Sequence, residues 1–109
     1  MYSRLLFFNS TMISIVNVKE TKELIAKNNS SLIILDVRTP EEFEEEHLAK
    51  AVNINIIDHQ FPEKIAKLSK EKNYIIHCHS GRRAHRAAEL MEESEFKHLF
   101  VVEGLIFGH

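Results

Sequence analysis

The sequence is poor in thiols, because Cys78 is the single cysteine among its 109 residues. A lone cysteine excludes a disulfide within the chain, which fits a reducing compartment. It also means that no second thiol of the same chain could resolve an oxidised Cys78 into an internal disulfide.

The sequence also lacks a strong excess of positive or negative charge, and it lacks long apolar runs. The formal net charge is -2 and the isoelectric point is near 6.4, so the chain carries no basic footprint for nucleic acid. The apolar run at residues 5–8 is shorter than a signal-peptide core and far shorter than a membrane span. We therefore expect a cytoplasmic protein that binds neither nucleic acid nor a membrane.

The length is that of one domain with a single core. The hydrophobic content of 44% and the charged content of 28% are ordinary for a soluble globular protein. A second methionine, Met12, precedes the first patterned segment. We therefore predict an N-terminal extension over residues 1–12, either loosely held or packed as an edge arm, and one domain over residues 13–109.

Short apolar segments alternate with helical patterns along the chain. Strands are predicted at residues 13–18, 32–35, 51–54, 74–77 and 99–102. Helices are predicted at residues 19–28, from Thr39, from Phe61, and at residues 83–94. This alternation predicts a doubly wound α/β fold, with a five-stranded, mostly parallel sheet and helices on both faces. Ligands of such folds bind beyond the carboxyl ends of the strands.

The clearest helix start is at Thr39-Pro40-Glu41-Glu42. Thr39 is a good N-cap, Pro40 suits the first helical position, and Glu42 stands three residues after the cap, as in a capping box. A helix is therefore predicted directly after the strand that ends near Asp36.

The stretch from Cys78 to Arg83 joins the predicted fourth strand to the last helix. In such a turn the main-chain N–H groups of the loop and of the first helical turn point at one spot, which favours negative charge. Arg82, Arg83 and His79 add positive charge, so the loop favours a thiolate at Cys78. The sequence predicts a nucleophilic sulfur with an anionic substrate held by main-chain amides. The simpler alternative is a buried, inert cysteine that ends a strand.

These segments resemble the rhodanese-like sulfurtransferases in their single-domain form. The resemblance rests on Asp36-Val37-Arg38-Thr39-Pro40-Glu41-Glu42-Phe43, on Ala51-Val52-Asn53-Ile54, and on Cys78-His79-Ser80-Gly81-Arg82-Arg83 with the alanine-bearing helix that follows. It covers roughly residues 14–108. Each stretch is weak by itself, but their order and spacing together are specific.

The resemblance implies transfer of a sulfane sulfur through a persulfide on Cys78. It further implies that His79, Ser80, Gly81, Arg82 and Arg83 form the active-site loop, with Asp36 and Arg38 as a supporting pair. The donor would be a small molecule such as thiosulfate, and the acceptor a thiol, cyanide or a protein. Neither a cofactor nor a metal is implied.

Two departures from the family pattern concern the surroundings of the site. Glu46 stands where the family usually has a glycine. After Glu103-Gly104 the chain reads Leu105-Ile106-Phe107-Gly108-His109, without the family's usual second glycine and following aromatic residue. The helix that follows this point in the family is therefore expected to be shortened here, with consequences for stability and for the wall of the site.

Three other readings of the cysteine loop remain open. Cysteine-dependent phosphatases also follow a His-Cys pair with an arginine-rich loop, but their arginine is six residues after the cysteine, where this chain has Ala84. A metal site at His77, Cys78 and His79 would require Cys78 to turn away, because consecutive residues of an extended segment point to opposite faces. The third alternative is a binding module without catalysis, although such a module would not need Cys78.

Overall fold

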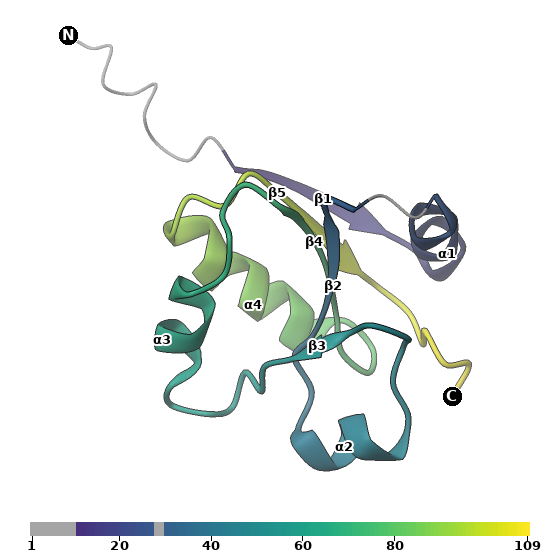
Figure 1. Ribbon diagram of the computed structural model, residues 1–109. Helices are drawn as coiled ribbons and strands as arrows, with labels where there is room; N and C mark the ends of the chain where they lie inside the picture. Colours follow the sequence, from purple (N-terminus) through teal and green to yellow (C-terminus); the bar gives the residue numbers. More distant parts are fainter. Residues whose placement is uncertain (1–10, 28–29) are drawn as a thin grey trace, which may run out of the picture.

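The computed structural model describes residues 11–27 and 30–109. Its strands are β1 (Met12–Val16), β2 (Leu32–Asp36), β3 (Val52–Asn53), β4 (Asn73–His77) and β5 (His98–Val102). They form one sheet in the order β1-β5-β4-β2-β3, and each of the four pairings is parallel (Figure 1). The predicted fold class is confirmed, with an entirely parallel sheet.

The helices are α1 (Val18–Ala26), α2 (Pro40–Glu45), α3 (Phe61–Ala66) and α4 (Arg82–Glu93). Helices α3 and α4 lie on one face of the sheet and α1 lies on the other, while α2 lies beyond the carboxyl end of β2 (Figure 1). No helix in the described part of the chain has the length and apolar composition needed to cross a membrane.

The predicted first strand ends earlier in the structure, at Val16. Val18 was expected in the first strand, but it opens α1 because Asn17 caps that helix with a capping box. The Asn17 side chain accepts a hydrogen bond from Glu20 N at 2.7 Å, and Glu20 Oε1 accepts one from Asn17 N at 2.8 Å. The predicted helix end at residues 28–29 and most of the N-terminal extension lie outside the described residues.

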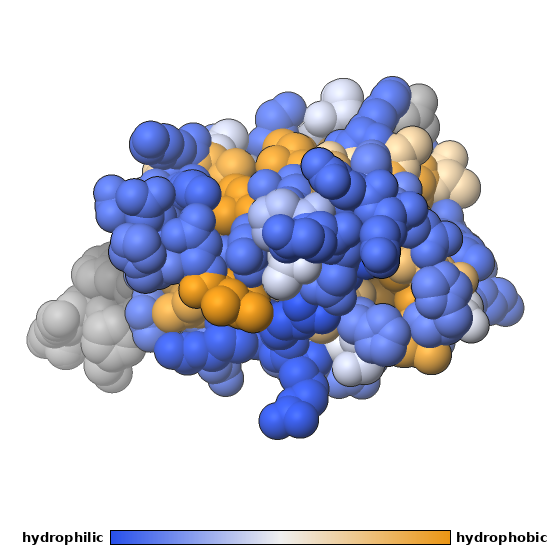
Figure 2. Space-filling model, turned by 90° about the horizontal axis from the view of Figure 1, so that it is seen from below, coloured by the Kyte–Doolittle hydropathy of each residue, from blue (hydrophilic) through white to orange (hydrophobic). Residues whose placement is uncertain are grey.

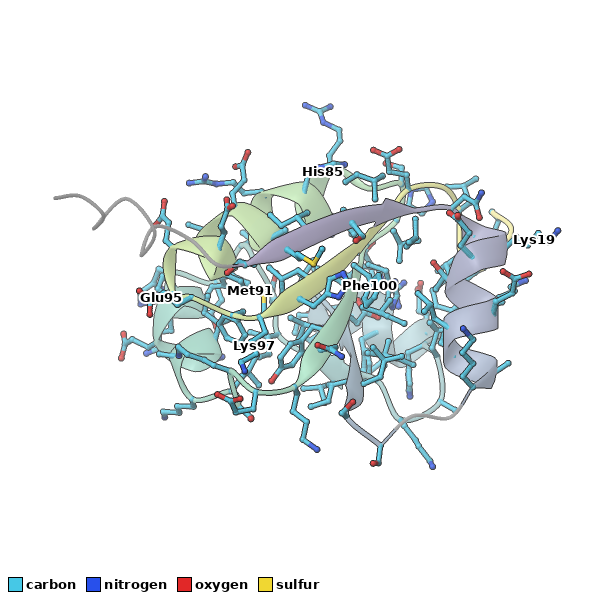
Figure 3. The ribbon with its side chains drawn as sticks, turned by 90° about the horizontal axis from the view of Figure 1, so that it is seen from above. Lys19, His85, Met91, Glu95, Lys97 and Phe100 are labelled. Atoms are coloured by element: carbon cyan, nitrogen blue, oxygen red, sulfur yellow. The ribbon has the colours of Figure 1, made fainter. Side chains whose placement is uncertain are left out.

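The core has two layers, one on each face of the sheet. Strand β4 contributes to both, because Tyr74 and Ile76 pack with the α3 and α4 cluster and Ile75 packs with the α1 cluster. Met91 of α4 is fully buried between that helix and the sheet, whereas Lys19 of α1 is exposed (Figure 3). The alternation of side chains also places His77 on the α1 face, next to Ile75.

Helix α2 is held by polar contacts rather than by burial. Of its six residues, all of which the structure describes, none is buried. The capping box is confirmed, since Glu42 N donates to Thr39 Oγ1 at 3.2 Å and Thr39 N donates to Glu42 Oε1 at 3.0 Å. From α4, Arg83 donates to the two carboxylate oxygens of Glu42 at 2.7 and 3.1 Å. Glu42 therefore both caps α2 and ties it to α4.

This ion pair shifts the titration of both partners. The hydrogen bonds from Arg83, helped by those from Thr39, lower the pKa of Glu42 from 4.5 to about 2. The hydrogen bond to Glu42 in turn raises the pKa of Arg83. The pair is half-buried, so water screens part of its attraction.

Replacing Thr39 by alanine should lower the free energy of unfolding by about 1 kcal/mol, because the cap of α2 is lost. Urea denaturation of the wild type and the variant would measure this difference. Glu44→Ala is the matched control, since Glu44 is exposed on the same helix and surface changes of this kind usually stay within about 0.5 kcal/mol. Equal losses in the two variants would contradict a capping role for Thr39.

Replacing Glu42 by glutamine should reduce the loss of stability in acid. The pKa of Glu42 is lower in the folded state than its ordinary value of 4.5, so the unfolded chain takes up this proton first as the pH falls. The stabilisation is complete above about pH 4.5 and disappears as the pH approaches 2. Urea midpoints measured across this range should therefore converge for the wild type and Glu42→Gln, whereas Glu44→Gln should follow the wild type. Parallel curves for Glu42→Gln would show that the ion pair is not formed in solution.

Candidate active site

Cys78 follows directly after β4, and the residue is only 3% exposed. Its Sγ accepts hydrogen bonds from the main-chain N–H groups of Gly81, at 3.1 Å, and of Ala84, at 3.4 Å. One donor lies in the loop and the other in the first turn of α4. Main-chain donors aimed at one atom near a helix N-terminus favour negative charge on that atom. The structure thus brings together the features that the sequence predicted around the sulfur.

The turn of this loop depends on Gly81. Its φ of +130° lies in a region that L side chains rarely adopt, and a Cβ at this position would be 3.3 Å from the carbonyl oxygen of Val102. The exit of β5 also supports the loop, because Gly104 N donates to the carbonyl oxygen of Ser80 at 3.2 Å. Close packing against β5 therefore holds the loop that carries the donors to Cys78.

A pocket of about 600 Å³ opens beside the sulfur. Its lining consists of Ile56, Cys78, His79, Ser80, Arg82, Arg83 and Arg86. The predicted loop residues His79, Ser80, Arg82 and Arg83 thus gather at one pocket, and Arg86 joins them one helical turn after Arg82. The pocket combines a thiol with a positively charged wall.

The three arginines of this wall are not equivalent. Arg83 is bound to Glu42, and Arg86 donates to Glu89 at 3.1 Å. The guanidinium of Arg82 is exposed and makes no ion pair or hydrogen bond with the residues that the structure describes. Arg82 is therefore the cation that remains available to an anionic ligand.

Asp36 and Arg38 form a buried pair beside the loop rather than in the pocket wall. Asp36 is 0% exposed and Arg38 is 5% exposed. Arg38 Nη2 donates to Asp36 Oδ2 at 2.7 Å, and Arg38 Nε lies 3.0 and 3.1 Å from the two carboxylate oxygens. These hydrogen bonds raise the pKa of Arg38. Because Asp36 stands opposite His77 in the parallel register, the pair flanks the peptide that leads into Cys78.

Arg38 also connects this pair to α2. Its Nη2 donates to the carbonyl oxygen of Glu46 at 2.6 Å. Glu46 caps the end of α2, so this hydrogen bond joins Arg38 to that helix. Glu46 occupies the position where a glycine was expected, and it has extended backbone angles that any residue adopts. The substitution therefore leaves the helix exit unstrained.

Residues 104–109, here called the C-terminal arm, supply contacts that were not predicted. The ring of Phe107 lies 4.9 Å from the guanidinium carbon of Arg38 and 5.9 Å from the ring of His77. His79 Nε2 lies 3.1 Å from the main-chain oxygen of His109. The departure of this segment from the family pattern was visible in the sequence, but nothing local indicated its contacts with Arg38, with His77 and with the active-site loop.

The two histidines beside Cys78 point to different surroundings. His77 is buried next to Asp36 and Phe107, whereas His79 is exposed and contacts the C-terminal arm. Within residues 11–27 and 30–109, no group of three or more His, Cys, Asp or Glu side chains is placed to hold a metal ion.

Comparisons with known proteins identify the family of the chain. Residues 17–107 match the family described as the rhodanese-like domain. The chain is 32% identical over 85 residues to the thiosulfate sulfurtransferase GlpE of Coxiella burnetii, covering 78% of this chain and 76% of GlpE. It is 33% identical over 73 residues to the thiosulfate sulfurtransferase PspE of Escherichia coli, covering 65% and 68% of the two chains.

A solved structure extends the match to the fold. The rhodanese-related protein of Thermoplasma volcanium superposes with a TM-score of 0.72 at 29% identity, covering 85% of this chain and 86% of that one. The match in sequence and the match in structure therefore both cover most of the chain. The chain belongs to the rhodanese family, with a rhodanese-like domain over residues 17–107.

Proposed function

We propose that this protein is a sulfurtransferase that takes a sulfane sulfur from thiosulfate or a similar anionic donor and passes it to a thiol or to cyanide. The observation that carries the proposal is that the sulfur of Cys78 accepts hydrogen bonds from two main-chain N–H groups, beside a pocket lined with arginines. Relatives that are themselves thiosulfate sulfurtransferases support this donor.

In the first half-reaction the thiolate of Cys78 attacks the outer sulfur of thiosulfate. A bond forms between Sγ and that sulfur, while the sulfur–sulfur bond of thiosulfate breaks. Its electron pair leaves with sulfite, and Cys78 becomes a persulfide. The N–H groups of Gly81 and Ala84 stabilise the anionic sulfur before the attack, and Arg82 attracts the anionic donor to the pocket.

In the second half-reaction an acceptor thiolate or cyanide attacks the outer sulfur of the persulfide. The bond between that sulfur and Sγ breaks, and its electron pair returns to Sγ as the thiolate. The products are a new persulfide or thiocyanate. The same two N–H groups then receive the leaving thiolate, so a single arrangement of donors serves both half-reactions.

The geometry supports sulfur transfer over the cleavage of phosphate esters. Arg83 is turned to Glu42, and the residue at the sixth position after Cys78 is Ala84, whose N–H points to the sulfur. A phosphatase would need a guanidinium there to bind two oxygens of a tetrahedral phosphate. A binding module without catalysis remains the other class, and the assays below separate it from an enzyme.

Treatment of the wild type with thiosulfate should add one sulfur atom to the protein, and addition of cyanide should then remove that sulfur as thiocyanate. Intact-mass spectrometry and a colorimetric thiocyanate assay would follow the two steps. Cys78→Ser is the control and should show neither the added mass nor turnover. Sulfur uptake by Cys78→Ser would contradict the assignment of the nucleophile, and an unmodified wild type would favour the binding module.

Arg82→Ala and Arg83→Ala should differ in kinetics. Arg82→Ala should raise the Michaelis constant for thiosulfate, and added salt should abolish the difference from the wild type, because an exposed charge is screened over about 10 Å at 0.1 M. Arg83→Ala should lower turnover about tenfold, because the hydrogen bonds that join α4 to Glu42 are lost. Steady-state rates at low and high salt test both expectations. A salt-sensitive Michaelis constant in Arg83→Ala, with lost turnover in Arg82→Ala, would reverse the two roles.

A further inference from the structure

The imidazole of His77 is buried directly before the nucleophile, and the mechanism above does not use it. The residue is 0% exposed, and its Nε2 is the one buried side-chain nitrogen or oxygen without a hydrogen-bond partner in the described part of the chain. Buried polar atoms are nearly always paired in folded proteins, so such an exception calls for a physical reason.

The unpaired nitrogen results from the two groups that face the ring. Nδ1 lies 3.4 Å from the carbonyl oxygen of Cys78, and Nε2 lies 3.6 Å from Oδ2 of Asp36. Both neighbours are acceptors, whereas a neutral imidazole has one N–H to donate. A neutral ring can therefore bond one of them, and an imidazolium could serve both.

The surroundings favour the neutral ring. Burial lowers the pKa of His77 below its ordinary value of 6.5, and Arg38 acts in the same direction, while Asp36 and the carbonyl of Cys78 oppose them. The charge of Asp36 is already matched by Arg38, which donates to both carboxylate oxygens. The C-terminal arm contributes the uncharged ring of Phe107. The groups that face His77 thus come from β2, from the active-site loop and from the arm.

The same contacts indicate which nitrogen carries the proton. Asp36 Oδ2 already accepts from Nε and Nη2 of Arg38 and lies beyond hydrogen-bond distance of Nε2. The carbonyl of Cys78 accepts no other hydrogen bond from the residues that the structure describes. A proton on Nδ1 therefore satisfies a carbonyl that would otherwise be buried without a donor.

We propose that His77 is a positioning residue for sulfur transfer, whose Nδ1–H holds the carbonyl of Cys78 and thereby orients the peptide from which the active-site loop begins. His77 does not touch the donor and acts through Cys78, so this role rests on the proposed function of that residue. The imidazole lies between the Phe107 ring, whose centroid is 5.9 Å away, and the Asp36 carboxylate, whose Oδ2 is 3.6 Å from Nε2.

A pair of amide variants tests the role, because the side-chain nitrogen of asparagine matches Nδ1 and that of glutamine matches Nε2. His77→Asn should keep the donor to Cys78 and retain turnover within about twofold, whereas His77→Gln should lose about two- to tenfold, the effect of one hydrogen bond. The Michaelis constant for thiosulfate should not change in either variant. Thermal unfolding would verify that both variants are folded at the assay temperature. A turnover of His77→Gln that equals or exceeds that of His77→Asn would overturn the proposal.

A second test, on the wild type, does not depend on catalysis. Nitrogen-15 correlation spectra of the histidine rings, with His77→Asn used to assign the signals, should show His77 as the neutral Nδ1–H tautomer at pH 8, with protonation only below pH 6.5. The Nε2–H tautomer or an imidazolium at pH 8 would contradict the proposal. If the wild type accepts no sulfur from thiosulfate, the proposed function fails, but the tautomer still decides whether His77 holds the Cys78 carbonyl.

Discussion

The hydrogen bonds from the N–H groups of Gly81 and Ala84 to the sulfur of Cys78 require the chain to pass from β4 into α4 through one tight turn. Gly81 permits this turn, because its φ of +130° and its contact with the Val102 carbonyl leave little room for a Cβ. The parallel sheet places the turn at the carboxyl ends of the strands, where loops from neighbouring strands meet. The charges and rings around the sulfur are arranged about this turn.

Two guanidinium–carboxylate pairs flank the turn and determine which charges a ligand meets. One pair, Asp36 with Arg38, is buried and borders the entry of the loop, and the other, Glu42 with Arg83, joins α2 to α4. In each pair the charges of the two side chains nearly cancel, and the arginine holds neighbouring segments together instead of binding a ligand. The positive charge that remains at the pocket is mainly that of Arg82, which is exposed and lines the pocket. An arginine-rich loop can therefore combine two structural ion pairs with one exposed cation for an anionic donor.

The C-terminal arm supports the site in place of the shortened final helix that the family pattern predicted. It binds the loop through Gly104 N, and its Phe107 ring packs on both Arg38 and His77. Viewed from below, the surface at this end of the molecule is largely hydrophilic with separate hydrophobic patches (Figure 2). The arm places an aromatic ring against Arg38 and His77, which are both buried. Hydrogen bonds of buried groups are stronger because the local dielectric is low.

The sequence by itself determined the alternation of strands and helices, the capping box at Thr39, and the loop in which main-chain donors meet Cys78. Each of these depends on residues that are close together in the chain, so spacing and side-chain chemistry are sufficient to predict it. Only the tertiary structure decided that Arg83 binds Glu42, that Phe107 covers His77, and that His77 is left with two acceptors and one proton. Apart from the contact between His77 and the neighbouring Cys78 carbonyl, these contacts join segments that are distant in sequence, and their distances depend on how the strands pair and how the arm folds back.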